Sequence, residues 1–187
     1  MSTIRSDRYV LTGGPGSGKT SLIDALAAAG YRRSSEVGRE IIQEQVAGGG
    51  RALPWVDPMR FAEAMLQREL LRYESLVPAD GPIFFDRGVP DVLGYLRVSG
   101  LTPTPSMLAA AGRVRYNRRV FILPPWPEIY AQDTERKQDL DEAIRTCDAM
   151  RAVYPSLGYE LIEVPPGAIA ARRDFVLREI GARASDA

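Results

Sequence analysis

The segment Gly13–Thr20 has the residue types and the spacing of a phosphate-binding loop. Its sequence, GGPGSGKT, matches G-x-x-x-x-G-K-[ST], with Gly13, Gly18, Lys19 and Thr20 at the fixed positions. Glycines let the backbone come close to a ligand, so that successive N–H groups surround a phosphate as a concave anion site. In this pattern the lysine reaches the β- and γ-phosphates, and the threonine hydroxyl binds Mg²⁺. The segment therefore predicts a binding site for ATP and Mg²⁺.

The residues on either side of the loop agree with this interpretation. The apolar run Tyr9–Leu11 precedes the loop as a short strand, and Ser21–Ala29 follows it as a helix-forming run that ends at Gly30. A helix that begins near Gly18 directs the positive end of its dipole at the phosphates. We expect Lys19 to act in catalysis. The residues expected to contact the nucleotide are Gly13, Gly14, Pro15, Gly16, Ser17, Gly18, Lys19, Thr20 and Ser21.

Asp86 ends a second apolar run, Pro82–Phe85. In phosphate-loop proteins an aspartate at such a strand end binds Mg²⁺, directly or through water. We therefore expect Asp86 and Thr20 to hold the metal, and Asp86 to act in catalysis. The alternative is an aspartate that only caps the next helix. Arg87 follows at once, and it either contacts a phosphate or an acceptor, or forms a surface ion pair.

Glu36 follows the predicted second strand, Tyr31–Ser35. This position lies at the carboxyl edge of the sheet, where ligands bind in open α/β folds. A carboxylate there accepts a proton from an attacking hydroxyl or helps to hold Mg²⁺. The alternative is an acid in the first turn of a helix, where it stabilises the helix dipole. Glu36 is accordingly a candidate catalytic residue.

A charged run, Asp133–Asp139, separates the fourth predicted strand from a long helix. Such a run is either a solvated surface or a mobile lid. A lid would bring Arg136 or Lys137 onto the transferring phosphate and supply charge there as an arginine finger does. We expect a lid-like segment at about residues 126–140, with Arg136 as its catalytic residue.

The elements that must position these residues alternate along the chain. The predicted strands are Tyr9–Thr12, Tyr31–Ser35, Ile83–Phe85, Val120–Leu123 and Glu160–Val164. Apolar residues at helical spacing lie between them, from Ala62 to Val77, from Leu140 to Leu157 and from Ile169 to Ile180. This alternation predicts an α/β fold in three layers, with a parallel five-stranded sheet and helices on both faces. We expect a single domain over residues 1–187 that ends in a polar tail, 182–187.

The composition limits the chemistry further. Lys plus Arg equals Asp plus Glu at 24 each, so nucleic acid is not an expected partner. The chain has no histidine, which excludes histidine nucleophile systems and histidine metal sites and leaves proton transfer to a carboxylate. The single cysteine, Cys147, lies in an apolar stripe and fits a buried thiol in a cytoplasmic protein. No stretch approaches the length of a membrane span, and the oligomeric state stays open.

Taken together, these segments resemble a known family. The blocks GGPGSGKTSLIDALAAAGY, SSEVGREII, FFDRG, FILPPWPEIYAQDTERKQDLDEA and VYPSLGYELIEVP are similar to small predicted ATPases of the AAA type, a group related to the ribosylnicotinamide-kinase domain and to nucleoside and nucleotide kinases. The resemblance implies a P-loop NTPase sheet of order 2-3-1-4-5, a carboxylate facing the acceptor at Glu36, and a lid arginine at Arg136. The chain is too short for a ring-forming AAA+ ATPase with its helical lid domain.

Three hypotheses follow for the activity. The first is a kinase that transfers the γ-phosphoryl group of ATP to a small hydroxyl-bearing metabolite or nucleoside. The second is an ATPase that acts as a nucleotide-dependent regulatory switch with a protein partner. The third is a nucleic-acid end kinase, which would use a basic track near Arg113, Arg115, Arg118 and Arg119.

Overall fold

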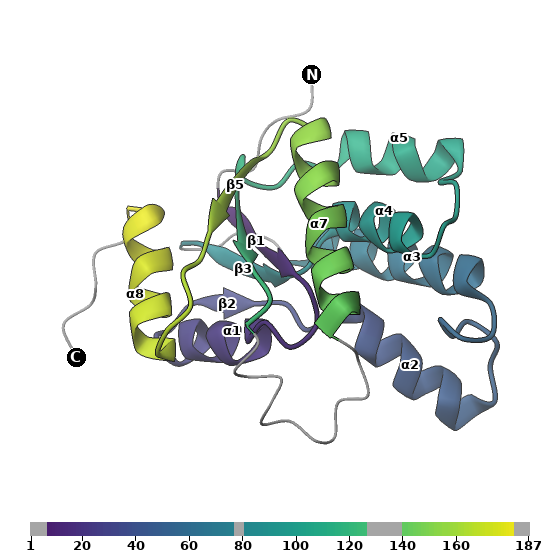
Figure 1. Cartoon of the computed structure of the whole chain (residues 1–187), viewed down its shortest axis with the longest axis horizontal. Coiled ribbons are helices and arrows are strands. Elements are labelled where there is room, and N and C mark those ends of the chain that lie inside the picture. The colour runs from purple at the N-terminus through teal and green to yellow at the C-terminus, as the bar shows by residue number, and fades with distance from the viewer. Residues whose placement is uncertain (1–6, 77–80, 127–139, 182–187) are drawn as a thin grey trace.

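A computed structural model of the chain describes residues 7–76, 81–126 and 140–181. Its centre is a parallel five-stranded sheet with the strand order β2-β3-β1-β4-β5, as expected (Figure 1). All the predicted strands are present, with bounds that differ by a few residues at most. They are β1 (Arg8–Gly13), β2 (Arg32–Arg33), β3 (Ile83–Asp86), β4 (Arg119–Leu123) and β5 (Glu160–Glu163).

Helices cover both faces of the sheet, so the three-layer α/β architecture is confirmed (Figure 1). On one face lie α1 (Lys19–Ala28) and α8 (Ile169–Glu179), which pack against each other. The other face is covered by α3 (Pro58–Ser75), α4 (Val89–Val98), α5 (Pro105–Arg113) and α7 (Leu140–Ser156). Helix α2 (Val37–Gly48) follows β2 and packs on α3.

The alternation of side chains along the strands builds a separate core on each face. Successive residues of a strand point to opposite faces, and both faces of a parallel sheet are covered, so the strands are apolar throughout. Val10 and Phe85 belong to the core under α3, α4 and α7, whereas Leu11 and Phe84 belong to the core under α1 and α8. Burying each of these side chains contributes roughly 1.5–3 kcal/mol to folding. The two cores therefore fix the strand ends, and with them the loops that carry the chemistry.

One predicted stripe is corrected by the structure. Ile144 was expected on the buried face of α7, but its exposed fraction is 42%. The inward face of α7 instead carries Ala143, Cys147, Met150 and Tyr154, at helical spacings of four, three and four. At Ala143 the helix backbone lies against Gly14 of the phosphate loop. Cys147 is buried, as predicted, and burial raises the pKa of its thiol.

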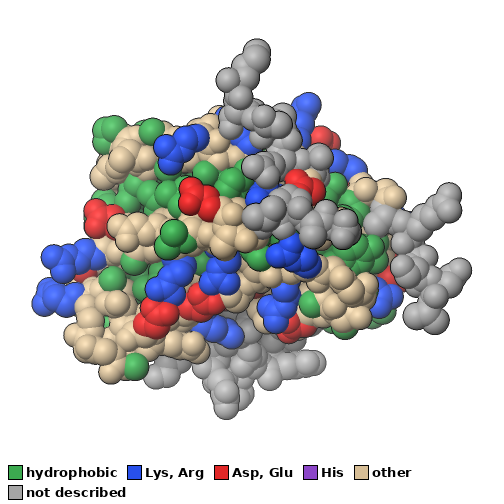
Figure 2. Space-filling view, turned by 180° about the vertical axis from the view of Figure 1, so that it is seen from behind, with side chains coloured by type: hydrophobic (Ala, Val, Ile, Leu, Met, Phe, Trp, Pro, Cys, Tyr) green, Lys and Arg blue, Asp and Glu red, His purple; other side chains and the backbone are tan. Residues whose placement is uncertain are grey.

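Charges of both signs are distributed over the surface. Figure 2 shows acidic and basic side chains interspersed over the face opposite to that of Figure 1, in keeping with the zero net charge. Over the described ranges, none of the helices is both long and apolar enough to cross a membrane.

Candidate functional site

Glycines in the phosphate loop occupy positions that no other residue fits. Gly13 ends β1 at a φ of 131°, and a Cβ atom added there would lie 2.3 Å from the Leu123 carbonyl oxygen of β4. A Cβ atom at Gly14 would lie 2.4 Å from the Ala143 carbonyl oxygen of α7. Gly18 has a φ of 77° and serves as the N-cap of α1, which begins where the sequence predicted. The loop is therefore held between β4, α7 and α1.

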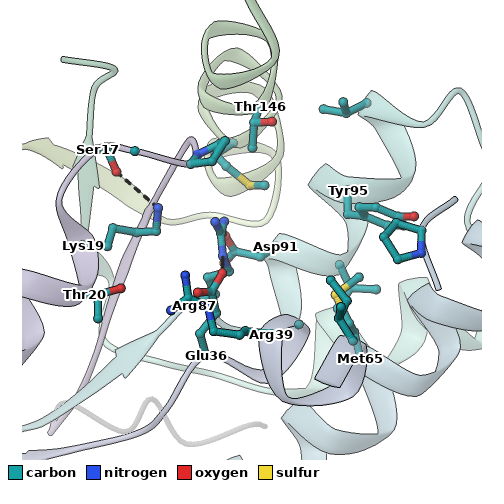
Figure 3. A pocket seen from close by; sticks show the side chains of 18 of the residues that line it. Ser17, Lys19, Thr20, Glu36, Arg39, Met65, Arg87, Asp91, Tyr95 and Thr146 are labelled. Carbon is teal, nitrogen blue, oxygen red and sulfur yellow. Dashed lines mark hydrogen bonds and ion pairs between the residues drawn. The ribbon is translucent and has the colours of Figure 1, made fainter. Parts of the chain in front are cut away.

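Lys19 lies across the loop. Its ammonium group donates hydrogen bonds to the carbonyl oxygens of Gly13 at 3.1 Å and Gly14 at 2.6 Å. It also donates to Oγ of Ser17 at 3.2 Å (Figure 3). Burial, reinforced by the charge of Arg87, lowers its pKa to about 7. Desolvation weakens the charged form of an amine, and a polyanionic ligand restores it. The lysine is thus placed to respond to a phosphate bound in the loop.

The loop opens into a cavity of about 830 Å³ that has two ends. One end is formed by residues 15–21, which include most of the residues expected to contact the nucleotide; Gly13 and Gly14 support the loop from behind. Side chains from α2, α3 and α4 form the other end, and α7 contributes Glu142, Thr146 and Met150. In Figure 3, Lys19 and Thr20 lie on one side and Tyr95 on the other, with Glu36 and Arg87 between them. The cavity therefore provides room for a second ligand beside the phosphates.

Glu36 is the N-cap residue of α2, but its carboxylate does not cap the helix. Instead Oε1 accepts a hydrogen bond at 3.2 Å from Nε of Arg87, which follows β3. Burial alone raises the pKa of Glu36, but the charges of Arg87 and Lys19 outweigh it and hold the pKa below its usual value. Glu36 is accordingly an ionised carboxylate that faces the cavity at neutral pH. Arg87 forms an ion pair, but inside the cavity rather than at the surface, and its contact with a phosphate or an acceptor stays a prediction.

Arg87 is held in an unusual backbone conformation. Among the described residues it is the only non-glycine residue with a positive φ, at 69°, which costs of order 1 kcal/mol or more and persists only where neighbouring contacts hold it. Its N–H donates to the Leu11 carbonyl oxygen at 3.0 Å, and Nη1 donates to the Gly13 carbonyl oxygen at 3.1 Å. The side chain therefore connects the end of β1 with Glu36.

Asp91 anchors the start of α4 beside this pair. Its Oδ2 accepts from the Gly88 N–H at 2.9 Å, and Oδ1 accepts from the Thr12 hydroxyl at 2.6 Å. The Tyr154 hydroxyl of α7 donates to the same carboxylate, and Nη1 of Arg87 lies 3.5 Å from it. This buried aspartate joins β1, α4 and α7 around the residues that follow β3. Its hydrogen bonds fix the turn from which Arg87 projects.

Asp86 and Thr20 occupy positions that suit Mg²⁺. Asp86 ends β3 beside Leu11 of β1, and its Oδ1 is buried without a hydrogen-bond partner. Burial raises the pKa of Asp86 to about 6, partly offset by the charge of Lys19. An orphaned carboxylate oxygen near a phosphate loop fits a hard cation that keeps its own waters and the phosphate oxygens as further ligands. The described ranges contain no cluster of three or more acidic or cysteine side chains suited to a metal ion.

Comparison with known proteins shows to which family the chain belongs. A family model described as an AAA domain matches residues 8–172. The chain belongs to this family. A search of curated proteins finds no match.

The fold of this AAA domain is similar to that of solved kinases. NadR in complex with NR matches with a TM-score of 0.70 at 18% identity, over 97% of this chain and 53% of NadR. A deoxyadenosine kinase from M. mycoides matches with a TM-score of 0.68 at 13% identity, over 93% of this chain and 98% of that one. A thymidylate kinase from Ehrlichia chaffeensis matches with a TM-score of 0.63 at 12% identity, over 94% of this chain and 98% of that one. At these identities the likeness establishes a P-loop, nucleoside-kinase-like fold.

The structure brings together most of the candidate residues of this AAA domain. Lys19, Thr20 and Glu36 line one cavity, and Asp86 lies behind it, buried and close enough to Lys19 for their charges to interact. Arg136 and nearly all of the expected lid, about 126–140, lie outside the described residues, as does the polar tail.

The cavity residues that sequence reasoning missed include Glu69, Asp91 and Tyr95. Asp91 carried a usable signal, because an acid three residues after Gly88 can accept the N–H at the start of a helix. Glu69 lies four and eight residues after Met65 and Phe61, so the three share one face of α3. A glutamate on such an apolar face was the signal that could have found it.

Proposed function

We propose that this AAA domain is a Mg²⁺-dependent kinase that transfers the γ-phosphoryl group of ATP to a hydroxyl group of a small metabolite or nucleoside. The observation that carries the proposal is the Glu36–Arg87 pair, an ionised carboxylate in the same cavity as the phosphate loop. A protein that only hydrolyses ATP needs a site for one water molecule, whereas this cavity extends well beyond the loop between α2, α3 and α4.

In the proposed reaction, Glu36 orients the acceptor hydroxyl and takes its proton. The hydroxyl oxygen forms a bond to the γ-phosphorus while the bond from that phosphorus to the β–γ bridging oxygen breaks, which releases ADP. Arg87 keeps Glu36 ionised until the transfer and fixes the direction in which it points. General-base assistance of this kind contributes about 10²- to 10⁴-fold to a rate.

The phosphate-loop residues carry the other half of the mechanism. Lys19 and the loop N–H groups bind the β- and γ-phosphates and stabilise the charge that develops on them. The Thr20 hydroxyl and the Asp86 carboxylate would hold Mg²⁺, which would supply positive charge to the phosphates. A lid arginine at Arg136 remains part of the proposal, although that residue lies outside the described ranges.

The position of the basic track argues for a small acceptor rather than a nucleic-acid end. Arg113, Arg115 and Arg118 precede β4 and therefore lie at the amino edge of the sheet, whereas the phosphate loop follows the carboxyl end of the parallel strand β1. Arg119 pairs with Glu179, and Arg115 stacks near Tyr159. The track and the phosphate loop are thus at opposite edges.

The test is a screen with γ-labelled ATP, Mg²⁺ and a panel of nucleosides, nucleotides and small hydroxyl metabolites. We expect labelled product with at least one acceptor. Glu36→Gln should lower kcat for that acceptor about 100-fold, because the amide cannot take the proton, while the Kd for ATP stays unchanged. Glu63→Gln, an exposed glutamate on α3, is the control and should keep the activity of the unmodified protein. Release of phosphate to water alone, with every acceptor and with equal rates in both variants, would refute the kinase proposal and favour the regulatory ATPase.

A further inference from the structure

Glu69 is a buried carboxyl group without a partner in the cavity. It lies on α3 with an exposed fraction of 4%, and it lines the cavity within range of the charges of Asp91 and Arg87. No hydrogen bond or ion pair to Glu69 exists within the described part of the chain. Buried polar groups are satisfied in nearly all native structures, and a buried group without a partner destabilises the fold. Such a group in a ligand cavity indicates that its partner comes from outside the protein.

The basic side chains nearest to Glu69 are engaged elsewhere. Arg72 donates to Ser35 at 2.7 Å and pairs with Glu40 at 2.7 Å. Arg87 pairs with Glu36 and the end of β1. Burial raises the pKa of Glu69 well above its usual value, and the negative charge of Asp91 adds to the effect. Burial therefore favours the protonated form of this carboxyl group, which has one O–H donor and one carbonyl acceptor side by side.

The surroundings of Glu69 suit a flat ring. Phe61 and Tyr95 meet edge to face, with ring centroids 5.3 Å apart, and Met65 lies next to them on α3. The buried Tyr95 hydroxyl lacks a hydrogen bond of normal geometry, although the Ser99 side chain lies beside it. Figure 3 shows Tyr95 and Met65 on the side of the cavity away from Lys19. This part of the cavity is apolar at its walls and offers polar groups at few points, as pockets for ring-bearing ligands do.

From these contacts we infer that Glu69 selects the acceptor, by pairing with a ring edge on which an N–H donor lies next to a lone-pair acceptor. The inference rests on the proposed function, because it concerns a part of the acceptor other than the reacting hydroxyl. A neutral carboxyl group forms two parallel hydrogen bonds with such an edge, through its carbonyl oxygen and its O–H. A ring without the N–H leaves the Glu69 carbonyl buried and unpaired, and a site of this kind rejects that ring strongly.

The decisive experiment compares probes that differ in one amino group. Adenosine and cytidine carry an amino group beside a ring nitrogen, whereas purine riboside and pyrimidin-2-one riboside lack the amino group and keep the nitrogen. Binding of each probe to the full chain is measured by calorimetry, without ATP turnover. We expect at least one amino-bearing probe to bind about tenfold or more tightly than its partner.

Two substitutions at Glu69 assign this preference to the residue. Glu69→Gln keeps a donor beside an acceptor, so it should preserve the preference to within about threefold. Glu69→Leu has a similar volume and no polar atom, so it should abolish the preference while an amino-free probe binds as well as before. Glu63→Gln on the exposed side of α3 is the matched control and should behave as the unmodified protein. Thermal unfolding shows that each variant is folded.

The remaining outcomes each overturn one statement. Equal weakening by Glu69→Gln and Glu69→Leu would show that Glu69 pairs as a charged carboxylate with a cationic ring, and would refute the neutral pairing. A preference that survives Glu69→Leu, or no binding of any probe, would refute the role of Glu69. Phosphorylation assays on the same probes separate this inference from the kinase proposal. If a probe is phosphorylated equally well with and without Glu69, only the inference about Glu69 is refuted. If a probe binds in a Glu69-dependent way but no probe is phosphorylated, only the kinase proposal is refuted.

Discussion

The two ends of the cavity are constructed in different ways. The phosphate-loop end comes from one consecutive segment, Gly13–Thr20, whose ligand groups are largely backbone N–H groups placed by glycine conformations. The other end, where we propose that the acceptor binds, is assembled from side chains at α2, α3 and α4, such as Glu36, Glu69 and Tyr95, which are distant in the sequence. The first arrangement suits any nucleoside triphosphate, whereas the second can differ between proteins of one fold. We therefore expect substitutions at the first end to affect every reaction of the protein, and those at the second end to change acceptor use.

The largest effect is expected at Lys19. Lys19→Ala removes the only side-chain charge that the loop directs at the β- and γ-phosphates, so phosphoryl transfer should fall about 10²- to 10³-fold for every acceptor. The ratio of rates between acceptors should stay the same, because Glu36 and Glu69 are untouched. Steady-state kinetics with two acceptors check both statements, and Arg60→Ala, an exposed cation on α3, is the control. Wild-type ATP turnover in Lys19→Ala would contradict the assignment of the phosphate loop.

A backbone position at the same end should be nearly as sensitive. Gly13→Ala places a Cβ atom 2.3 Å from the Leu123 carbonyl oxygen at a φ of 131°. The loop must shift, and we expect a loss of about 1–3 kcal/mol in the free energy of unfolding together with weaker ATP binding. Gly112→Ala in α5 is the matched control, because no atom lies within 4 Å of its added Cβ. That substitution should be neutral or stabilise the protein by up to about 1 kcal/mol in urea unfolding.

The same contrast explains what the sequence revealed. The loop residues and Asp86 at the end of β3 were predictable because each follows from a local pattern of glycines or apolar residues. The strand order was predictable only from the resemblance to a known family. The partner of Glu36 was not decided, since Arg87 lies 51 residues away in the sequence and the pairing depends on how β2 and β3 align. Glu69 was missed because an isolated glutamate in a helix normally faces solvent. Only the packing of α3 against α4 buries it.

Arg87 lies between the two ends of the cavity (Figure 3), and the pH dependence of kcat tests how far it controls the ionisation of Glu36. The depressed pKa of Glu36 means that its ionised form stabilises the folded protein above the pKa of the unfolded chain, and that this stability is lost as pH falls. In Arg87→Gln, the largest charge that opposes the effect of burial is lost, so the pKa of Glu36 should rise and the acid limb of kcat should move to higher pH. Activity at neutral pH should fall about tenfold.

The profile is measured as kcat at saturating Mg²⁺ and ATP, because kcat reports the groups of the bound complex. Arg39→Gln is the comparison, since Arg39 lowers the pKa of Glu36 without an ion pair and is the weakest contributor among the named cations. The acid limb of kcat should move less in Arg39→Gln than in Arg87→Gln. Identical profiles for both variants and the unmodified protein would show that Arg87 does not control the ionisation of Glu36.

The smallest effect is expected at Tyr154, which contacts neither end directly. Its hydroxyl donates to Asp91, the anchor of the turn that carries Arg87, so Tyr154→Phe removes one buried hydrogen bond and should cost about 1 kcal/mol of stability. For a chain of this size, this lowers Tm by about 2–4 °C. Because Gly88 and Thr12 still hold Asp91, kcat should change by less than about threefold, and ATP affinity should not change. Tyr31→Phe in the other core is the control for loss of a hydroxyl. A fall in kcat as large as that of Arg87→Gln would instead mean that α7, which lies against the phosphate loop at Ala143, couples the two ends through Asp91.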